Sequence, residues 1–324
     1  MGNLKLYLAH PAPDRDWIRK QELFIEERYP ITLINPFYDT ERKDMVDVDS
    51  GKRALAAASL DYSAIVENDL SAIDEADGLL AIITSNISIG THMEMWYAYT
   101  NHIPIFTICF EQSRIAHPWV RYVTEPNCIF DSFDKFVGKI TSSFIPPTIN
   151  ILFVGKRRVG KDTAGKYLIN KYNFRRFAFA DEVKYITKRL KGYTSNEIKE
   201  KPPVVVNDLQ KIGTECFRSI YPDIWIDYSF RIIDRKRKVL PAEYARIVIT
   251  DGRFENEVHR SNLKNFWIVK ITKGKIDQIH PEHVSETESE GILPDYSITN
   301  DGTFDELYKQ IDDLPLIKDV WYKI

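Results

Sequence analysis

The stretch INILFVGKRRVGKDT, residues 149–163, decides how the second half of the chain folds. Its largely apolar beginning predicts a buried strand, and AGKYLINKYN (164–173) follows with helical periodicity. Between them, Gly155 and Gly160 permit backbone angles that turn successive amides toward a bound anion. A strand, a glycine-rich turn and a helix in this order are the context in which this glycine–lysine spacing binds phosphate.

The lysine of this loop and the two residues after it predict a bound nucleotide and a Mg²⁺ ion. Lys161 would neutralise the β- and γ-phosphates, and the helix N-terminus adds partial positive charge. Asp162 stands where a Ser or Thr usually binds magnesium and Thr163 follows it, so either is a candidate metal ligand. The alternative is a chance glycine-rich turn. The predicted nucleotide-binding residues are Gly155, Val159, Gly160, Lys161, Asp162 and Thr163.

Two further buried strands are predicted downstream, over YARIVITD (244–251) and FWIVKIT (266–272). The first ends in Asp251, and Arg253 follows two residues later. A carboxylate at the carboxyl end of a parallel strand lies at the ligand crevice, so Asp251 is predicted to organise magnesium or the acceptor phosphate. Arg253 is predicted to clamp a phosphate bidentately. The alternative is a surface turn with a salt bridge.

This half resembles the phage deoxynucleoside monophosphate kinase family. The matching segments are GKRRVGKDT (155–163), LQKIGTECFRSIYPDIWID (209–227), VITDGRFENEV (248–258), HVSE (283–286) and ITNDGTFDEL (298–307). The resemblance implies a P-loop NTPase-type parallel sheet and Mg²⁺-dependent phosphorylation of a deoxynucleoside monophosphate by ATP. It makes Lys161, Asp251 and Arg253 candidate catalytic residues, and Arg218 and Arg253 candidate substrate-binding residues. A P-loop ATPase or switch is the alternative.

The first half alternates between strand-like and helix-like stretches. LKLYLAH (4–10), ITLINPF (31–37), GLLAIIT (78–84) and IPIFTICF (103–110) read as strands, with helical stretches between them. This alternation predicts a doubly wound α/β domain with a parallel sheet. TSSFIPPTIN (141–150) interrupts the periodicity and is the best linker, so we expect two α/β domains, residues 1–144 and 145–324.

Glu94 is the candidate catalytic residue of the first half. It is expected in the first turn of a helix over 91–102, at the carboxyl-end crevice of the sheet beyond strand 78–84. Such a carboxylate can attack an anomeric carbon and form a covalent sugar intermediate. From spacing alone, a carboxylate that only stabilises the helix N-terminus is the stronger interpretation.

The first half is similar to the nucleoside 2-deoxyribosyltransferase family over roughly 4–110. The matching segments are LYLAHP (6–11), NPFYD (35–39), VENDLSAIDEADGLLAII (66–83) and GTHMEMWYAY (90–99). The resemblance implies a flavodoxin-like fold and makes Glu94 the nucleophile and Tyr7 the tyrosine that orients it. Asp69 matches the acid that contacts the deoxyribose hydroxyl or the neighbouring helix. The family also implies a homo-oligomer formed through this domain.

One departure from that family leaves the reaction open. Transferases of the best-known type carry an aspartate about six residues before the nucleophile, whereas this chain reads Ser85-Asn-Ile-Ser88 there. Members of the same superfamily hydrolyse nucleoside 5′-monophosphates, and Arg15 and Arg19 are candidates for binding such a 5′-phosphate. They are equally explained as solvated helix charges. The first domain is therefore a transferase, an N-glycosidase or a non-catalytic nucleotide-sensing module.

Composition limits the partners of the 324-residue chain. A net charge of −3 argues against a nucleic-acid polymer, and no stretch is apolar enough to span a membrane. Three scattered cysteines suit a reducing cytoplasm, which would be the host's if the gene belongs to a phage. Because both halves handle deoxynucleotides, we expect base exchange with a free nucleobase, then phosphorylation of the monophosphate. Together, these two reactions would supply a modified deoxynucleotide for phage DNA.

Overall fold

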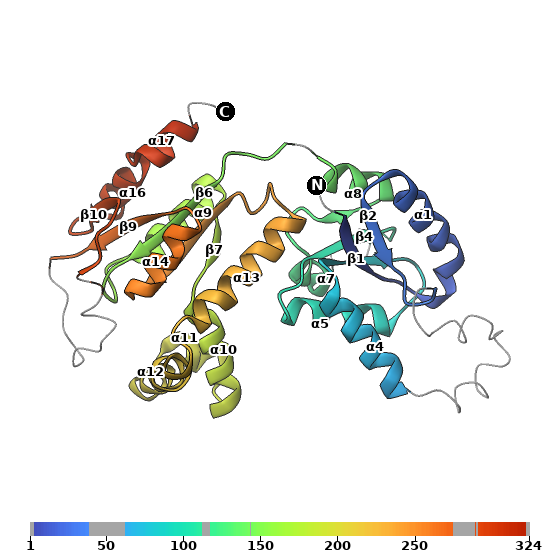
Figure 1. Ribbon diagram of the computed structural model, residues 1–324, viewed down its shortest axis with the longest axis horizontal. Coiled ribbons are helices and arrows are strands. Elements are labelled where there is room, and N and C mark those ends of the chain that lie inside the picture. Colours follow the sequence, from blue (N-terminus) through green and yellow to red (C-terminus); the bar gives the residue numbers. More distant parts are fainter. Residues whose placement is uncertain are drawn as a thin grey trace. The chain divides into compact units, whose positions relative to one another are not determined.

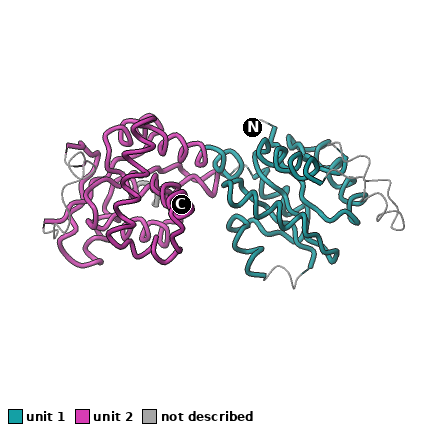
Figure 2. The backbone as a smooth tube through the Cα atoms, turned by 90° about the horizontal axis from the view of Figure 1, so that it is seen from below, with its two compact units in different colours: residues 1–144, 234–240 teal, residues 145–233, 241–324 magenta. Residues whose placement is uncertain are grey.

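The computed structural model describes residues 3–38, 62–111, 117–142, 144–274, 289 and 291–321. The HVSE segment at 283–286 and Asp39 of the NPFYD segment lie outside these residues. The chain forms two compact units, which Figure 2 shows in teal and magenta. Unit 1 comprises residues 1–144 and 234–240, and unit 2 comprises residues 145–233 and 241–324. Each unit is an α/β structure with a parallel sheet of five strands (Figure 1).

The sheet of unit 1 has the strand order β2-β1-β3-β4-β5, with every neighbouring pair parallel. Strand β3 is buried along its whole length, which explains why its sequence is apolar on both faces. The strands are β1 (Leu4–Ala9), β2 (Ile31–Ile34), β3 (Gly78–Ile83), β4 (Ile105–Cys109) and β5 (Ile129–Phe130).

Helices connect these strands. They are the 3₁₀ helix η1 (Ala12–Asp14), α1 (Arg15–Arg28), α4 (Tyr62–Glu75), α5 (Ile89–Thr100), α7 (Pro118–Val123) and α8 (Phe133–Ile140). Helix α5 begins two residues earlier than the sequence pattern predicted, because the Ser88 hydroxyl caps it by accepting the Thr91 amide at 3.1 Å. Glu94 therefore lies in the second turn, and the expectation that it lies in the first was wrong.

The sheet of unit 2 has the order β10-β9-β6-β8-β7, again with parallel neighbours. Strand β6 is central and fully buried, and its end pairs with the end of β8 through Val154 and Gly252. This register brings the loops after β6 and β8 to the same edge of the sheet. The strands are β6 (Ile149–Val154), β7 (Arg175–Phe177), β8 (Arg246–Gly252), β9 (Phe266–Thr272) and β10 (Tyr296–Thr299).

The helices of unit 2 include an eight-residue π-helix, η2. The others are α9 (Lys161–Tyr172), α10 (Ala180–Lys191), α11 (Ser195–Glu200), α12 (Pro203–Gln210), α13 (Ile224–Val239), α14 (Glu255–Leu263), α16 (Phe304–Asp312) and α17 (Pro315–Trp321), and η2 spans Lys211–Arg218. Helix α13 is shared between the units, because its residues from 234 onward belong to unit 1. Among the described residues, no helix is both long and apolar enough to cross a membrane.

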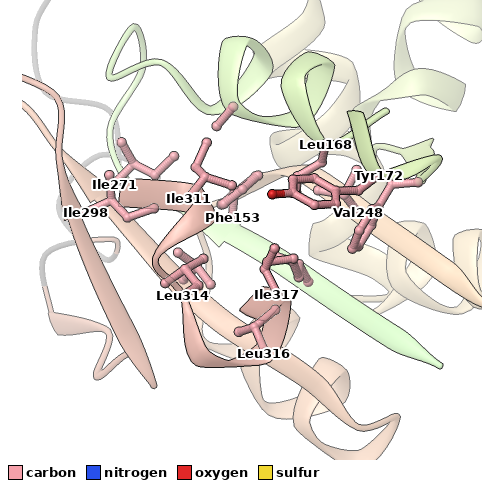
Figure 3. Packing of buried hydrophobic residues seen from close by; sticks show 14 of the residues in the cluster. Phe153, Leu168, Tyr172, Val248, Ile271, Ile298, Ile311, Leu314, Leu316 and Ile317 are labelled. Atoms are coloured by element: carbon pink, nitrogen blue, oxygen red, sulfur yellow. The ribbon is translucent and has the colours of Figure 1, made fainter. Parts of the chain in front are cut away.

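One buried cluster joins the sheet of unit 2 to three of its helices (Figure 3). Phe153 and Val248 come from the neighbouring strands β6 and β8, Leu168 from α9, Ile311 from α16 and Ile317 from α17. Because α9 and α16 both pack on the sheet, the loops that precede them are held near its carboxyl edge. The core thereby positions the glycine-rich loop and the loop after β10.

Candidate active sites

The glycine-rich loop of unit 2 depends on its glycines for conformation and space. Gly155 and Gly160 have φ angles of 139° and 106°, a region that side chains resist. A Cβ atom on Gly155 would lie 2.3 Å from the Ile271 carbonyl oxygen of β9. Lys161 is buried, and its ammonium donates to the carbonyls of Gly155 and Lys156. The loop therefore wraps around its own lysine.

The first turn of α9 is tied to strand β8. The Thr250 hydroxyl donates to a carboxylate oxygen of Asp162 at 3.0 Å. A Cβ on Gly165 would lie 2.4 Å from the Thr250 methyl group, so the helix and the strand are in direct contact. Thr163 is the third residue of the helix. Sequence reasoning did not identify Thr250, although it immediately precedes the predicted Asp251.

Asp251 lies at the end of β8, where it was expected, but it also has a structural partner. Its two carboxylate oxygens accept the amides of Phe179 and Ala180 at 3.0 and 2.9 Å. These amides lie at the N-terminus of α10, whose partial positive charge favours an anion. The carboxylate thus joins strand β8 to α10 at the loop edge of the sheet.

Arg218, Arg253 and Glu257 form a connected group beside this strand. Arg218 ends η2 and donates to Glu257, and the Arg253 and Phe254 amides donate to the other carboxylate oxygen at 2.7 and 3.1 Å. The Arg218 guanidinium also lies over the Phe254 ring, 4.3 Å from its centroid. Burial raises the pKa of Glu257 despite the opposing charge of Arg218. Glu257 was not predicted as a site residue, although it lies in the matched 248–258 segment.

Several cations of unit 2 interact with one another electrostatically. Burial lowers the pKa of the Lys201 ammonium, and the charges of Lys184, Arg157 and Arg253 lower it further. Asp162 acts in the opposite direction. Like charges that interact in this way favour an anionic ligand such as a phosphate.

The described residues contain no group of three or more His, Cys, Asp or Glu side chains that could hold a metal by themselves. Magnesium in kinases typically takes one or two protein oxygens and completes its shell with substrate phosphates and water. Asp162 and Thr163 lie in the first turn of α9 and Asp251 lies at the end of β8, so all three are at the same edge of the sheet and could share such an ion.

In unit 1 the structure brings Tyr7 and Glu94 together. Tyr7 is fully buried in β1, and its hydroxyl donates to a Glu94 carboxylate oxygen at 2.9 Å. Because Glu94 lies in the second turn of α5, the helix N-terminus does not account for its position. An oriented, half-buried carboxylate is suited to nucleophilic attack.

The other predicted residues of unit 1 lie on two helices. Asp69 is buried on α4, a helix that packs against both β1 and α5. On α1, the Nε atom of Arg15 lies 3.5 Å from a carboxylate oxygen of Asp16. Arg19 forms an ion pair with Glu22, which is fully buried. The charge of Arg19 is thus partly compensated within the fold.

Asp14 is a buried carboxylate that immediately precedes α1. Its side chain makes no capping hydrogen bond to that helix. It accepts instead from the Trp17 indole at 3.1 Å, the Thr84 hydroxyl at 2.6 Å and the Asn86 amide at 2.9 Å. Asp14 therefore fixes the loop between β3 and α5, which leads to Glu94.

Comparison with known proteins gives two findings. Residues 6–140 match the family described as nucleoside 2-deoxyribosyltransferase. The chain is also 30% identical over 180 residues to a protein of Acanthamoeba polyphaga mimivirus named "Putative deoxynucleotide monophosphate kinase", covering 49% of this chain and 91% of that protein. Both findings point to a transferase of nucleotide metabolism. The chain belongs to the deoxynucleotide monophosphate kinase family and carries an N-terminal nucleoside 2-deoxyribosyltransferase domain.

Proposed function

We propose that residues 145–324 form a P-loop kinase that transfers the terminal phosphoryl group of ATP to a deoxynucleoside 5′-monophosphate. The observation that carries this proposal is the glycine-rich loop, with two left-handed glycines and a buried lysine at the start of α9. A loop of this kind presents backbone amides and one ammonium group to phosphate oxygens. Its position at the carboxyl edge of a parallel sheet supports the same assignment.

The acceptor monophosphate would bind on the β8 side of the loop. Arg218 and Arg253 are suited to its phosphate, because Glu257 binds the Arg218 guanidinium and the backbone amide of Arg253. An oxygen of that phosphate attacks the γ-phosphorus, the bond to the bridging oxygen breaks, and ADP and a deoxynucleoside diphosphate leave. Lys161 and the cations near Lys201 would stabilise the charge on the transferring group.

Magnesium would be held between the phosphates and a few side chains at the strand ends. Asp162, Thr163 and Asp251 are the candidate ligands. When bound, the ion would neutralise phosphate charge and align the two phosphates. Asp251 would have a second task, because its bonds to the α10 amides keep that helix in place.

The kinase is tested by mass spectrometry of full-length protein incubated with ATP, Mg²⁺ and each deoxynucleoside monophosphate. We expect ADP and one or more deoxynucleoside diphosphates, and loss of at least 100-fold in rate for Lys161→Met. Release of phosphate without a diphosphate product would favour an ATPase or a switch instead. Lys166→Met on the same helix, an exposed residue, is the matched control and should retain activity.

We further propose that residues 1–144 catalyse 2-deoxyribosyl transfer with Glu94 as the nucleophile. The Tyr7–Glu94 hydrogen bond is the supporting observation, and the sheet order β2-β1-β3-β4-β5 agrees with a flavodoxin-like fold. The carboxylate attacks C1′, the glycosidic bond breaks, and the departing base takes up a proton. A second base then attacks C1′ and releases Glu94. Asp69 would contact the deoxyribose.

Hydrolysis is the alternative for this domain, because residues 85–88 contain no acid to handle the proton of the base. Product analysis with and without an acceptor base separates the two reactions. Exchange requires the acceptor, whereas an N-glycosidase releases free sugar phosphate in its absence. Glu94→Gln should abolish either reaction and remove the mass increment of the sugar adduct from the intact protein. A sensing module would show no C1′ chemistry in any variant.

The two activities would act in sequence on one deoxynucleotide. A kinase that needs a monophosphate suggests that the first domain also accepts 5′-monophosphates, with Arg15 and Arg19 as the candidates for binding the phosphate. Purified protein that exchanges bases only on unphosphorylated nucleosides would exclude this link. Oligomerisation through the first domain is a separate proposal, which sedimentation of the full chain tests.

A further inference from the structure

The loop after β10 reaches the glycine-rich loop through one side chain. Asn300 immediately follows β10, and its backbone amide donates to the Thr272 carbonyl at the end of β9 at 2.8 Å. Its side-chain amide donates to the Val159 carbonyl at 2.9 Å. Two residues that are 141 positions apart in the sequence are thus joined at the loop that precedes α9.

This contact is close enough to constrain the loop. A Cβ atom on Gly160 would lie 2.4 Å from the Asn300 side-chain nitrogen, so the amide group packs directly against this glycine. Gly160 also has a φ angle of 106°. Glycine is therefore required at position 160 for its backbone angle and to make room for Asn300.

The hydrogen bond from Asn300 also fixes the orientation of the peptide between Val159 and Gly160. In a trans peptide the carbonyl of one residue and the N–H of the next point in opposite directions. Because Asn300 holds the Val159 carbonyl, the Gly160 N–H points to the side away from Asn300. Without the bond, this peptide plane could rotate, since glycine tolerates many backbone angles.

The loop that carries Asn300 is itself well anchored. Asp301 accepts the Gly274 amide at 2.6 Å, and Thr303 and Glu306 form a capping box at the start of α16. Gln310 binds the backbone of Thr299 through both of its amide atoms. The Asn300 side chain is therefore presented from a rigid support.

We propose that Asn300 is a positioning residue for the triphosphate, aiming the Gly160 amide at a phosphate oxygen of ATP. The inference rests on the proposed kinase function and adds to it a residue outside the glycine-rich loop. Asn300 itself need not touch the nucleotide. It acts by limiting the peptide between Val159 and Gly160 to the orientation that binding requires, which removes an ordering cost from ATP binding.

The test uses the full chain with Asn300→Leu and Asn300→Asp, which keep the size of the side chain but remove its N–H donor. We expect the Kd and the KM for ATP to rise at least tenfold in both variants, with kcat and the KM for the monophosphate changed less than threefold. Inhibition by adenosine, which has no phosphates, should be unaffected. A side chain that only fills space would leave all of these values near those of wild type.

Gln310→Leu is the matched control, because it removes amide hydrogen bonds to β10 one residue away from Asn300 without reaching the glycine-rich loop. It should leave ATP affinity within twofold, and the melting temperature of each variant shows whether it folds. ATP affinity within twofold of wild type in both Asn300 variants would overturn the inference while leaving the kinase intact.

Failure of the proposed function would look different. If wild-type protein binds ATP but transfers no phosphate, the kinase assignment fails. The Kd values for ATP of the Asn300 variants then still test the positioning role of Asn300. If wild-type protein does not bind ATP, both proposals are wrong.

Discussion

The buried ion pair of unit 2 leads to a quantitative prediction for Arg218→Met. Glu257 is 2% exposed, and Arg218 is the cation that compensates its charge. Removing one partner of a buried pair typically costs about 3–5 kcal/mol of unfolding free energy, because a charge remains without its counterion. Two backbone amides still bind the Glu257 carboxylate, so we expect a loss near the lower end, about 3 kcal/mol. Methionine retains an apolar stem over Phe254.

The loss should depend on pH in a defined direction. Burial raises the folded-state pKa of Glu257 above its ordinary value of about 4.3, so its favourable contribution is complete at low pH and is lost as pH rises through the folded-state pKa. Without the opposing charge of Arg218, that pKa rises further. The deficit of Arg218→Met should therefore be larger at high pH and shrink as pH falls and Glu257 becomes protonated.

Urea unfolding of the full chain, followed by circular dichroism between pH 5 and 8, measures this effect. The double variant Arg218→Met with Glu257→Gln should recover at least half of the loss at pH 8, because the neutral amide needs no counterion. A loss below about 1 kcal/mol, or one that is the same at every pH, would refute the assignment of a compensated buried charge.

Three further perturbations test other contacts. Gly165→Ala places a methyl group 2.4 Å from the Thr250 methyl group and should cost about 1–3 kcal/mol in urea unfolding. Adding Thr250→Ser, which removes that methyl group, should restore stability, and no recovery would contradict the contact. Tyr7→Phe removes the donor to Glu94 and should slow C1′ chemistry roughly 100-fold in single-turnover assays at unchanged melting temperature, whereas a rate within twofold argues against orientation by this phenol. For Asp312, burial raises the carboxyl pKa, but hydrogen bonds from an ammonium and two phenols lower that pKa overall. The Asp312 carboxylate therefore stabilises the fold above the ordinary pKa, and this stabilisation is lost as pH falls through the lowered pKa. Asp312→Asn should thus cost about 1 kcal/mol at pH 7 and less below pH 4, and an equal cost at both pH values would exclude this charge effect.

The sequence was sufficient for much of the fold. The apolar runs at 78–84 and 149–155 predicted buried strands, and β3 and β6 are buried along their length. A strand of a parallel sheet that is covered on both faces is apolar at nearly every position, so the sequence alone identifies it. The predicted ends of helices and strands were less accurate. Helix α5 begins at Ile89, since the Ser88 hydroxyl caps it, and this changed the turn in which Glu94 lies.

The site was predictable only where local sequence carries the chemistry. Gly155, Gly160 and Lys161 are recognisable because backbone angle and charge are properties of adjacent residues. Glu257 and Asn300 were not singled out, although both lie in segments that matched the kinase family. Their partners are Arg218 and Val159, 39 and 141 residues away, and nothing in the local spacing pairs them.

The sequence by itself determined the α/β class and the glycine-rich loop, because periodicity and short motifs reflect local backbone geometry. Its resemblance to a known family singled out Glu94 as the candidate nucleophile. Only the tertiary structure decided that Asp251 holds α10, that Asp14 anchors the loop leading to Glu94, and that Asn300 binds the Val159 carbonyl. These are contacts between strand ends and loops that are distant in the chain. Parallel strand order brings such ends to one edge of a sheet, and that order arises from packing of the whole unit rather than from any single segment.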